Sequence, residues 1–416
     1  MQKFILPSVL LLSVILLGAC KDKPAAGPSL ESQVATNYAN ILEAGYQDSY
    51  KAAVAMQTKI EQFLANPTEQ GLEDAKKAWL AAREPYMQTE IGRFYDGPID
   101  GEKGDGVLNS WPLDEGYIDY LSGASHGYSS SEKDFTTGIV NKPAEFPTIS
   151  QDVLVSNNQP DGGRKNANGD DIQVSVGYHA IEFLLWGQDN TPAGSKIPGQ
   201  RSYKDYLTTA DATAPNGDRR ALYLKAITQL AIDNLKALAD AWAPGADNYR
   251  KNFEANLSSA IGCMFNGVGR LAKGEMSGER MGTPLRVNAQ EQEHSCFSDN
   301  THRDLWLNMQ GIVNVYYGKY KRIDGSEISG PGLSDYVKSL NPTDDARMKT
   351  LLTEAQARLK EIENNKPFDW LIDGDNSSGN EIVRKGLNAV AAVADWVTQI
   401  SHDLKLSKVT IPEENP

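Results

Sequence analysis

Apolar side chains recur at intervals of three and four residues along most of the chain, which is the spacing of one helix face. This pattern predicts helices over residues 33–66, 70–94, 172–187, 219–243, 247–274, 302–321, 343–364 and 379–406. In the last two segments a charged face lies opposite the apolar positions, as in helices that pack one side against a core. We therefore expect an all-α fold.

Residues 95–171 interrupt the helical pattern, because they are rich in Gly, Asp, Asn, Ser and Pro. Irregular segments of this length are uncommon inside a domain and usually carry a function or cover a surface. The chain is long enough for two domains, and we expect helical bundles over 33–215 and 216–416. Both halves contain two long helices, an irregular loop and a helix that opens with a histidine, His179 and His302. This order indicates a degenerate duplication, with the long irregular insertion in the first half.

The N-terminus has the features of an exported lipoprotein. Residues 1–19 combine one basic residue, an apolar run and small residues before Cys20, as in a secretory signal peptide. The sequence LLGAC resembles a lipobox, which predicts a lipid on Cys20, and residues 20–32 have the composition of a tether. Because Lys21 rather than aspartate follows the cysteine, we expect the periplasmic side of an outer membrane or the cell surface. No later segment is long enough to span a membrane.

Charge and composition exclude several function classes. The formal net charge of −14 argues against a nucleic-acid partner, and no basic, aromatic-rich patch is present. The chain contains no phosphate-binding glycine loop after a strand. Beyond the N-terminal region only Cys263 and Cys296 remain. In an oxidising compartment they could form a disulfide, and two buried thiols are the alternative.

The most apolar helical segment, VGYHAIEFLLWGQD at 176–189, contains an ionisable pair. His179 and Glu182 are three residues apart and therefore share a helix face. An unpartnered buried carboxylate is very costly, so Glu182 requires a metal, an arginine or a proton. A histidine and a carboxylate at this spacing can ligate one metal, and a structural ion pair is the alternative.

A second constellation follows one helix face in residues 79–100. Arg83, Tyr86, Glu90 and Arg93 recur at helical spacing. Arginine pairs carboxylates through two hydrogen bonds, so these residue types suit a buried network, and a solvated face is the alternative. The following DGPID turn would direct Asp100 back toward the helix end. Without a metal, Arg83 or Arg93 is the expected partner of Glu182.

A third constellation concentrates acidic residues and histidines between 286 and 306. Its candidate ligand-binding residues are Glu293, His294, Asp299, His302 and Asp304. The SDNT sequence is also a typical start for the helix that follows, so Asp299 could simply cap it. The two histidines could equally be loop residues without a role.

Four stretches together resemble the imelysin family of bacterial exported proteins. They are AREPYMQTEIGRFYDGPID, GYHAIEFLLWGQD, GERM and QEHSCFSDNTHRD. The resemblance implies two helical bundle-like domains with the G-x-H-x-x-E segment, here Gly177, His179 and Glu182, near a site between them. It also implies a link to iron uptake, and some family members are classed as metallopeptidases. A hydrolytic zinc needs three protein ligands, so a further ligand would have to come from Glu90, Asp100, His294 or His302.

From these residues we expect a binding protein that captures a metal ion, iron before zinc, or a metal-dependent small ligand. The expected metal ligands are His179, Glu182, Glu90 and Asp100. The expected ligand contacts are Arg83, Tyr86, Arg93, Glu293, His294, Asp299, His302 and Asp304. The expected partners are a membrane, through the lipid anchor, and iron-transport components. A metallopeptidase that uses His179 and Glu182 is the alternative, and a scaffold with an arginine-neutralised network ranks third.

Overall fold

The computed structural model describes residues 27–123, 133–160, 162–163, 165, 172–406 and 409–411. The expected signal peptide, the lipidation site Cys20 and residues 21–26 of the tether lie outside the described residues. Among the helices of the described ranges, none is long and apolar enough to cross a membrane.

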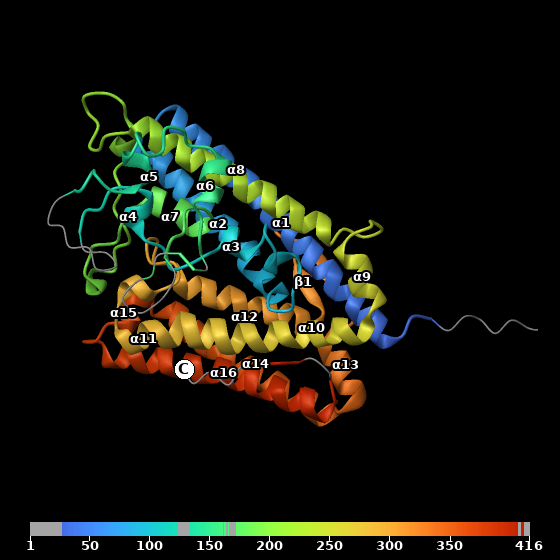
Figure 1. The fold of residues 1–416 in the computed structure, drawn as a ribbon. Coiled ribbons are helices and arrows are strands. Elements are labelled where there is room, and N and C mark those ends of the chain that lie inside the picture. Colours follow the sequence, from blue (N-terminus) through green and yellow to red (C-terminus); the bar gives the residue numbers. More distant parts are fainter. Residues whose placement is uncertain are drawn as a thin grey trace, which may run out of the picture.

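Three long helices form the first group, coloured blue to yellow-green in Figure 1. They are α1 (Leu30–Ala65), α2 (Glu69–Thr89) and α8 (Gly217–Ala241). The helix α1 packs along both α2 and α8, and the short helix α7 (Tyr178–Trp186) contacts α2 and α8. Side-chain caps start the first two helices, because the hydroxyls of Ser29 and Thr68 accept hydrogen bonds from the backbone N–H three residues ahead.

A second group of helices lies below the first in Figure 1. It contains α10 (Leu257–Arg270), α12 (Thr301–Tyr317), α14 (Pro342–Asn364) and α16 (Ser377–Asp403). The helix α12 packs against α2 on one side and α14 on the other, so it joins the two groups. The buried apolar side chains of both groups form one cluster. The all-α prediction is confirmed, whereas the division near residue 215 stays a prediction; α8, which follows it, packs along α1.

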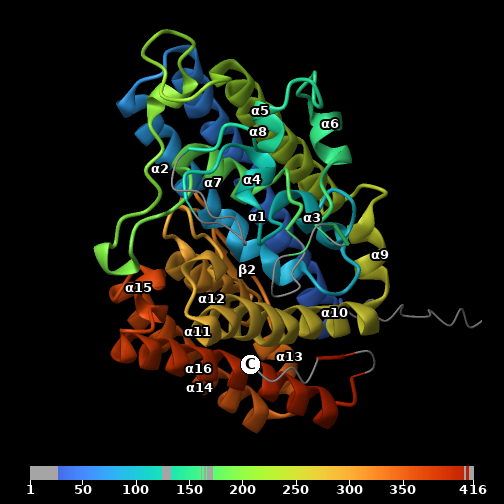
Figure 2. The ribbon, with the colours of Figure 1, turned by 60° about the vertical axis from the view of Figure 1, so that its left-hand side comes forward.

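Short elements make up most of the remaining structure. Those of the irregular segment are η1 (Glu90–Gly92), η2 (Pro98–Asp100), α3 (Asp105–Leu108), α4 (Glu115–Ile118), α5 (Gly138–Asn141) and α6 (Gln151–Ser156). The others are η3 (Ala193–Ser195), η4 (Tyr203–Tyr206), α9 (Tyr249–Ala255), α11 (Thr283–Val287), η6 (Gln290–Gln292), α13 (Leu333–Leu340) and α15 (Phe368–Ile372). Figure 2 shows that α3, α5 and α6 lie over α8, which each of them contacts.

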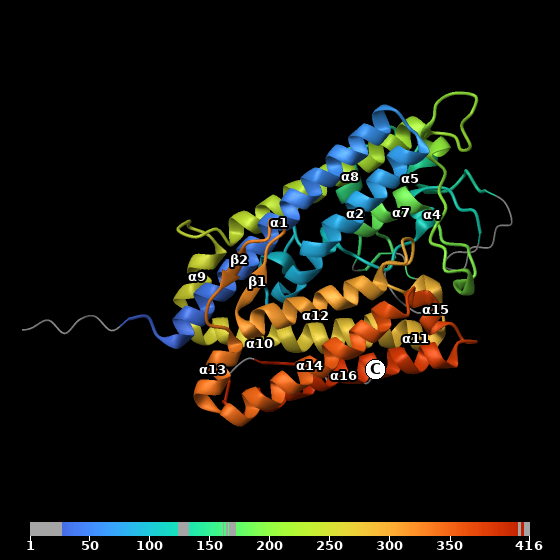
Figure 3. The same cartoon turned by 180° about the vertical axis from the view of Figure 1, so that it is seen from behind.

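Besides the helix predicted over 70–94, which ends at Thr89, three predicted helices differ from the observed ones. The helix predicted over 172–187 begins only at Tyr178, because Gly177 has a φ of 93°. The helix predicted over 302–321 ends at Tyr317, and Gly318 turns the chain with a φ of 70°. An antiparallel hairpin of β1 (Lys319–Lys321) and β2 (Glu327–Ser329) follows, beside α1 in Figure 3.

The third difference is the helix predicted to end at Gly274. After a break at Asn256 and the helix α10, the chain continues as the π-helical segment η5 (Leu271–Gly282). The hydroxyl of Ser277 donates to the carbonyl of Ala272, five residues back, at 2.6 Å. This wider helix carries Arg280 into the interior, where it is 2% exposed.

The possible disulfide between Cys263 and Cys296 is wrong, because the structure has these two cysteines as thiols that are not joined.

Candidate functional site

Two buried histidines meet between the two helix groups. His179 comes from the first turn of α7, and His294 comes from the loop that precedes α12. Their Nε2 atoms are 3.2 Å apart, and their rings are nearly perpendicular, at 71°. Each side chain is about 1% exposed. The fold therefore brings together two histidines that are 115 residues apart in the sequence.

Each histidine is held by a carboxylate at its other ring nitrogen. Glu182 Oε2 is 2.9 Å from Nδ1 of His179, and Asp304 Oδ2 is 2.9 Å from Nδ1 of His294. Ser298 donates to Glu182 Oε1 from its backbone N–H at 2.9 Å and from its hydroxyl at 2.7 Å. Such partners fix the orientation of an imidazole and decide which nitrogen faces the site.

The tight packing of α7 at this site depends on Gly177. A Cβ atom at this position would lie 2.8 Å from the carbonyl oxygen of Leu108, in addition to the unfavourable φ of 93°. Trp79 of α2 donates from its indole N–H to the carbonyl of Tyr178 at 2.9 Å. These contacts set the first turn of α7, and with it His179, against α2 and the irregular segment.

Burial dominates the protonation of the first pair. Burial lowers the pKa of His179 well below its usual range, and nearby His294 and Arg83 act in the same direction. Burial raises the pKa of Glu182 to about 8, against the hydrogen bonds from Ser298. A neutral imidazole beside a carboxyl group that retains its proton is the arrangement that these shifts favour near pH 7. Burial, followed by the charges of Arg280 and Arg83, also lowers the pKa of His294.

Asp304, by contrast, lies beside an arginine. Arg83 of α2 donates to Asp304 Oδ2 at 3.0 Å, and both side chains are fully buried. The hydroxyl of Ser295 donates to the same oxygen at 2.6 Å. Arg83 also donates to the side-chain oxygen of Asn109. This network connects α2 and α12 behind His294.

Glu90 is the centre of a second arginine network. Arg280 donates to its two oxygens at 2.7 and 3.0 Å, and Arg93 donates at 3.2 Å. Asn308 and Asn109 donate to the remaining acceptor sites at 2.7 and 3.1 Å. Burial alone would raise the pKa of Glu90, but Arg280 and Arg93 hold it well below its usual range.

A cavity of about 320 Å³ opens beside these networks and reaches His294. Its polar wall contains Arg93, Asp105, Asn109, Trp111, Glu275, Arg280 and His294. Arg93 pairs with Asp105 and Glu275 at 2.9 and 3.2 Å, so the charges of the wall are largely matched. The indole N–H of Trp111 donates to the backbone carbonyl of Glu293, which fixes the loop next to His294. The cavity is therefore a route by which a small ligand could approach His294.

Comparison with known proteins identifies the family. Residues 42–396 match the family model described as Imelysin. The chain belongs to the imelysin family. It is 25% identical over 331 residues to iron-regulated protein A of Synechococcus elongatus, an alignment that covers 76% of this chain and 70% of that protein.

Two solved structures share the imelysin fold. One, from Parabacteroides distasonis, is described as an iron-regulated protein A precursor; it matches with a TM-score of 0.63 at 19% identity and covers 91% of this chain and 97% of that one. An imelysin-like protein from Psychrobacter arcticum matches with a TM-score of 0.61 at 13% identity, over 92% of this chain and 98% of that one. At these identities the likeness concerns the fold.

One expected contact of this imelysin chain is wrong. The sequence predicted that Arg83 or Arg93 would neutralise Glu182, but Arg83 pairs with Asp304 and Arg93 pairs with Glu90, Asp105 and Glu275. Glu182 instead contacts His179 and Ser298. The reason is spatial: α12 packs against α2, which brings Asp304 to Arg83.

Glu90 and Asp100, expected as metal ligands, serve other purposes here. The oxygens of Glu90 are occupied by arginine and asparagine donors, as described above. Asp100 accepts hydrogen bonds from the backbone N–H groups of Phe94, Tyr95 and Gly97, at 2.9 to 3.1 Å. It therefore stabilises the turn after η1, beside the cavity that also reaches His294.

The remaining expected residues divide between the packing and a separate cluster. Tyr86 is fully buried and packs at 4.9 Å against the ring of Tyr178. His302 lies in the first turn of α12, and its Nδ1 has no hydrogen-bond partner in the described part of the chain. Glu293 and Asp299 belong to an acidic cluster on the other side of the loop.

Sequence reasoning missed several residues of the site. Arg280, Asn308 and Asn109 surround Glu90, and Ser298 holds Glu182. The GERM stretch pointed to Arg280 only through the family resemblance. Asn109 lies in the irregular segment, where no periodic pattern indicates which side chains face inward.

Proposed function

We propose that this imelysin-family protein binds a metal ion, iron first, between His179 and His294. The observation that carries the proposal is the 3.2 Å separation of their Nε2 atoms, each on a ring whose Nδ1 contacts a carboxylate. Outer carboxylate partners of this kind are typical of histidines that ligate metals, because they orient the ring and raise its basicity.

The donor set fits a metal ion. When Glu182 loses its proton and both Nδ1–H groups donate to their carboxylates, both Nε2 lone pairs face the same small space, and two such acceptors repel each other unless a cation or a proton lies between them. Nitrogen ligands lie about 2.0–2.1 Å from zinc, so two of them at a tetrahedral angle are about 3.3 Å apart. The observed separation of 3.2 Å agrees with this value. Imidazole nitrogens suit both iron and zinc.

Without a metal, the two nitrogens can form one hydrogen bond only if one of them carries a proton. The lowered pKa values of both histidines favour the neutral rings that a metal requires. A metal ion would therefore displace a proton from the pair rather than compete with two imidazolium charges.

The family supports the choice of iron as the first candidate. A curated relative is named iron-regulated protein A, and this chain covers 70% of its length. We further propose that the protein is exported, anchored by a lipid on Cys20 at the periplasmic side of the outer membrane or the cell surface, and acts with iron-transport components. These proposals rest on residues 1–20 of the sequence.

The metallopeptidase alternative requires a third protein ligand and an open position for water. Glu182 and Asp304, the carboxylates that contact the histidines, are occupied with the outer ring nitrogens. In addition, Glu182 accepts a hydrogen bond from Ser298, and Asp304 forms an ion pair with Arg83. Within the described residues this arrangement favours binding over hydrolysis.

The test is titration of the full chain with iron(II) and zinc in an isothermal calorimeter, in two buffers of different ionisation enthalpy. We expect one ion per chain and release of about one proton. The variants His179→Ala and His294→Ala should weaken binding at least 100-fold. His402→Ala is the matched control, because this histidine is exposed on α16 and its ring lies beside Asp403.

Melting temperatures of the same variants separate binding from folding. Equal affinity in all variants, or a loss of stability without a loss of affinity, would contradict the proposal. Incubation of the metal-loaded protein with an unfolded polypeptide tests the alternative. Cleavage that disappears in His179→Ala would favour the peptidase.

A further inference from the structure

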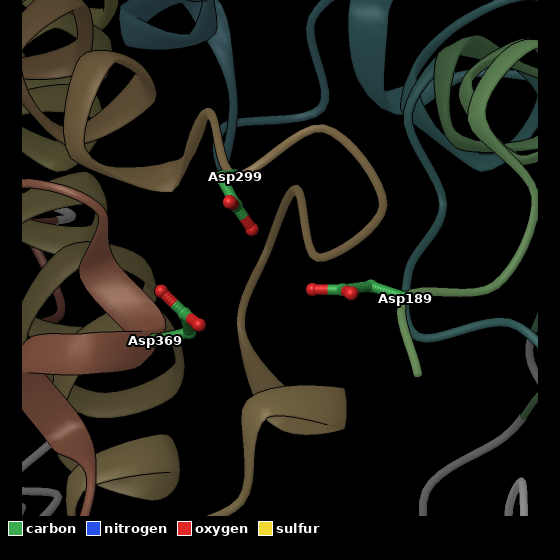
Figure 4. A group of neighbouring side chains, drawn as sticks. All are labelled: Asp189, Asp299 and Asp369. Carbon is green, nitrogen blue, oxygen red and sulfur yellow. The ribbon is translucent and has the colours of Figure 1, made fainter. Parts of the chain in front are cut away.

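Three aspartates from distant parts of the chain converge outside the histidine site. Asp189 follows α7, Asp299 belongs to the loop before α12, and Asp369 lies in α15. One carboxylate oxygen of each lies within 4.8 Å of those of the other two. Figure 4 shows the three side chains turned toward a common space. Such a close approach of three like charges is unfavourable unless something compensates for it.

Two of these carboxylates are buried, and one oxygen of each lacks a hydrogen-bond partner. Asp299 is 7% exposed and Asp369 is 2% exposed, yet Oδ1 of each accepts no hydrogen bond from the described residues. Both oxygens of the neighbouring Glu293, which is fully buried, are also without a donor in this part of the chain. Buried polar atoms are nearly always hydrogen-bonded, so the unpartnered oxygens of Asp299 and Asp369 indicate a missing ligand.

Asp189 is held in position for the same space. Its Oδ1 accepts hydrogen bonds from the N–H and hydroxyl of Thr191, at 3.0 and 2.8 Å. Its Oδ2 accepts one from the side-chain amide of Gln290 at 2.8 Å. Each carboxylate oxygen has two lone pairs, so these contacts orient the group and leave acceptor capacity.

Within the described ranges, no basic side chain pairs with this cluster. No lysine or arginine among the described residues forms an ion pair with Asp189, Asp299 or Asp369, and none accompanies Glu293. Burial, followed by the charges of Asp369 and Asp189, raises the pKa of Asp299 to about 8. Burial also raises the pKa of Asp369 to about 6.

We propose that Asp189, Asp299 and Asp369 bind a hard divalent cation, calcium in the first place. The ligand atoms are all carboxylate oxygens, the type that calcium prefers, and no histidine or cysteine of the described residues joins the cluster within 4.8 Å. Calcium–oxygen distances of about 2.3–2.6 Å allow two ligand oxygens of one ion to lie up to about 5 Å apart. This site is distinct in chemistry and in residues from the histidine pair, and it does not rest on the function proposed above.

A bound cation would fasten three segments of the chain to one another. Asp299 follows Ser298, which donates to Glu182, and Glu293 precedes His294. The loop between α11 and α12 would thus be held at its second half against α15 and the chain after α7. The site therefore has a structural role, which is to fix the loop that carries His294.

Calorimetric titration with calcium chloride tests this proposal on the full chain after dialysis against a chelator. We expect one calcium ion per chain, and a rise in Tm of at least about 3 °C at a concentration ~100-fold above Kd. Asp299→Asn and Asp369→Asn keep the size of the side chain and should weaken binding at least tenfold. Asp375→Asn is the matched control, because Asp375 is exposed in the turn that follows α15.

His179→Ala should retain calcium binding, which separates this site from the histidine pair. Absence of both heat and a Tm shift with 10 mM calcium, magnesium or manganese would overturn the proposal. So would unchanged affinity in both aspartate variants, provided that circular dichroism shows them folded. A heat with iron alone would overturn the assignment to calcium.

Discussion

Two groups of buried carboxylates, one formed by Glu90 and Asp304 and the other by three aspartates, differ in their counter-charges. Glu90 and Asp304 contact Arg280, Arg93 and Arg83 at 2.7 to 3.2 Å. The aspartate cluster, which consists of Asp189, Asp299 and Asp369, contacts no lysine or arginine in the described part of the chain. The chain thus neutralises one group itself and leaves the other to an external partner.

This difference separates a structural role from a binding role. A buried charge must be paired, and a pair made by the protein contributes to the folded structure whether or not a ligand is present. Carboxylates that no side chain pairs are stable only when they retain protons or bind a cation. The presence or absence of a guanidinium group is therefore a more useful guide to binding than the number of acidic residues.

The histidine pair lies between these extremes. Glu182 and Asp304 contact the two rings in the same way, but Asp304 also contacts Arg83, whereas Glu182 receives only neutral donors from Ser298. The two sides of the pair therefore differ in charge, although their geometry is similar. In the metal-free pair, this asymmetry favours a proton on the His179 side, next to Glu182, over the His294 side.

The largest effect should come from removing a cation of the arginine group. Arg280→Met leaves Glu90 buried with one arginine fewer, and we expect the free energy of unfolding to fall by about 3 kcal/mol or more. Urea denaturation at pH 7 measures this loss. The double variant Arg280→Met/Glu90→Gln should recover part of it, because a neutral amide needs no counter-charge.

Arg286→Met is the matched control, since Arg286 is exposed on α11, six residues after Arg280. A loss below ~1 kcal/mol for Arg280→Met would show that Arg93 alone neutralises Glu90. In that case the arginine-neutralised group would depend on Arg93 and Arg83, without a contribution from Arg280.

The second effect concerns acid. Asp119, which follows α4, pairs with Arg220 at 2.6 Å and Arg201 at 2.9 Å. Burial would raise its pKa, but the two arginines lower it to about 2. Because this folded value lies below the unfolded one, the pairing stabilises the fold above pH ~4, and ~2 kcal/mol is lost as pH falls from about 4 to 2.

Urea denaturation of the wild type and Asp119→Asn at several pH values measures this contribution. The difference in unfolding free energy between the two proteins should shrink as the pH falls through this window. A constant difference from pH 5 to pH 2 would contradict the assignment of Asp119 to the arginine-neutralised type.

A substitution in the aspartate cluster should have the opposite effect on stability from those in the arginine-neutralised groups. With calcium removed by a chelator, Asp299→Asn should raise the free energy of unfolding by about 1 kcal/mol, because the amide is neutral whereas the buried carboxyl group, with its pKa raised to about 8, must take up a proton on folding. With calcium present the same variant should be less stable than the wild type. A loss of stability under both conditions would show that the carboxylate has a partner of its own.

Long helices were predictable from the sequence because their signals are local. The helices α1, α14 and α16 were predicted with starts within three residues, since apolar spacing and capping residues define them. The hairpin β1–β2 was missed because its three-residue strands are too short and too polar for an alternating pattern.

The site was predictable in its residue types but not in its pairings. His179 and His294 were both identified, yet nothing local indicates that they meet across 115 residues. The partner predicted for Glu182 was wrong because Arg83 meets Asp304, which is 221 residues away. Asp369 was not recognised, because it belongs to the aspartate cluster only through the packing of α15 beside the loop.

The smallest effect should come from Ser298, which connects the two sides of the loop. Ser298→Ala removes the hydroxyl donor at 2.7 Å from Glu182 but retains the backbone N–H at 2.9 Å. We expect a loss of about 0.5–1.5 kcal/mol in the free energy of unfolding, as for one hydrogen bond. Iron affinity should fall less than tenfold, because the carboxylate that orients His179 remains and removal of such a partner typically costs about 10- to 100-fold.

Ser156→Ala serves as the control, since this exposed serine donates only to Val153 within α6. Calorimetric titrations of Ser298→Ala with iron and with calcium then compare the two sites in one variant. A change in iron affinity with constant calcium affinity is expected, because Ser298 contacts Glu182 and not the aspartates. An equal change in both affinities would mean that the loop moves as one unit, so that the histidine pair and the aspartate cluster are coupled.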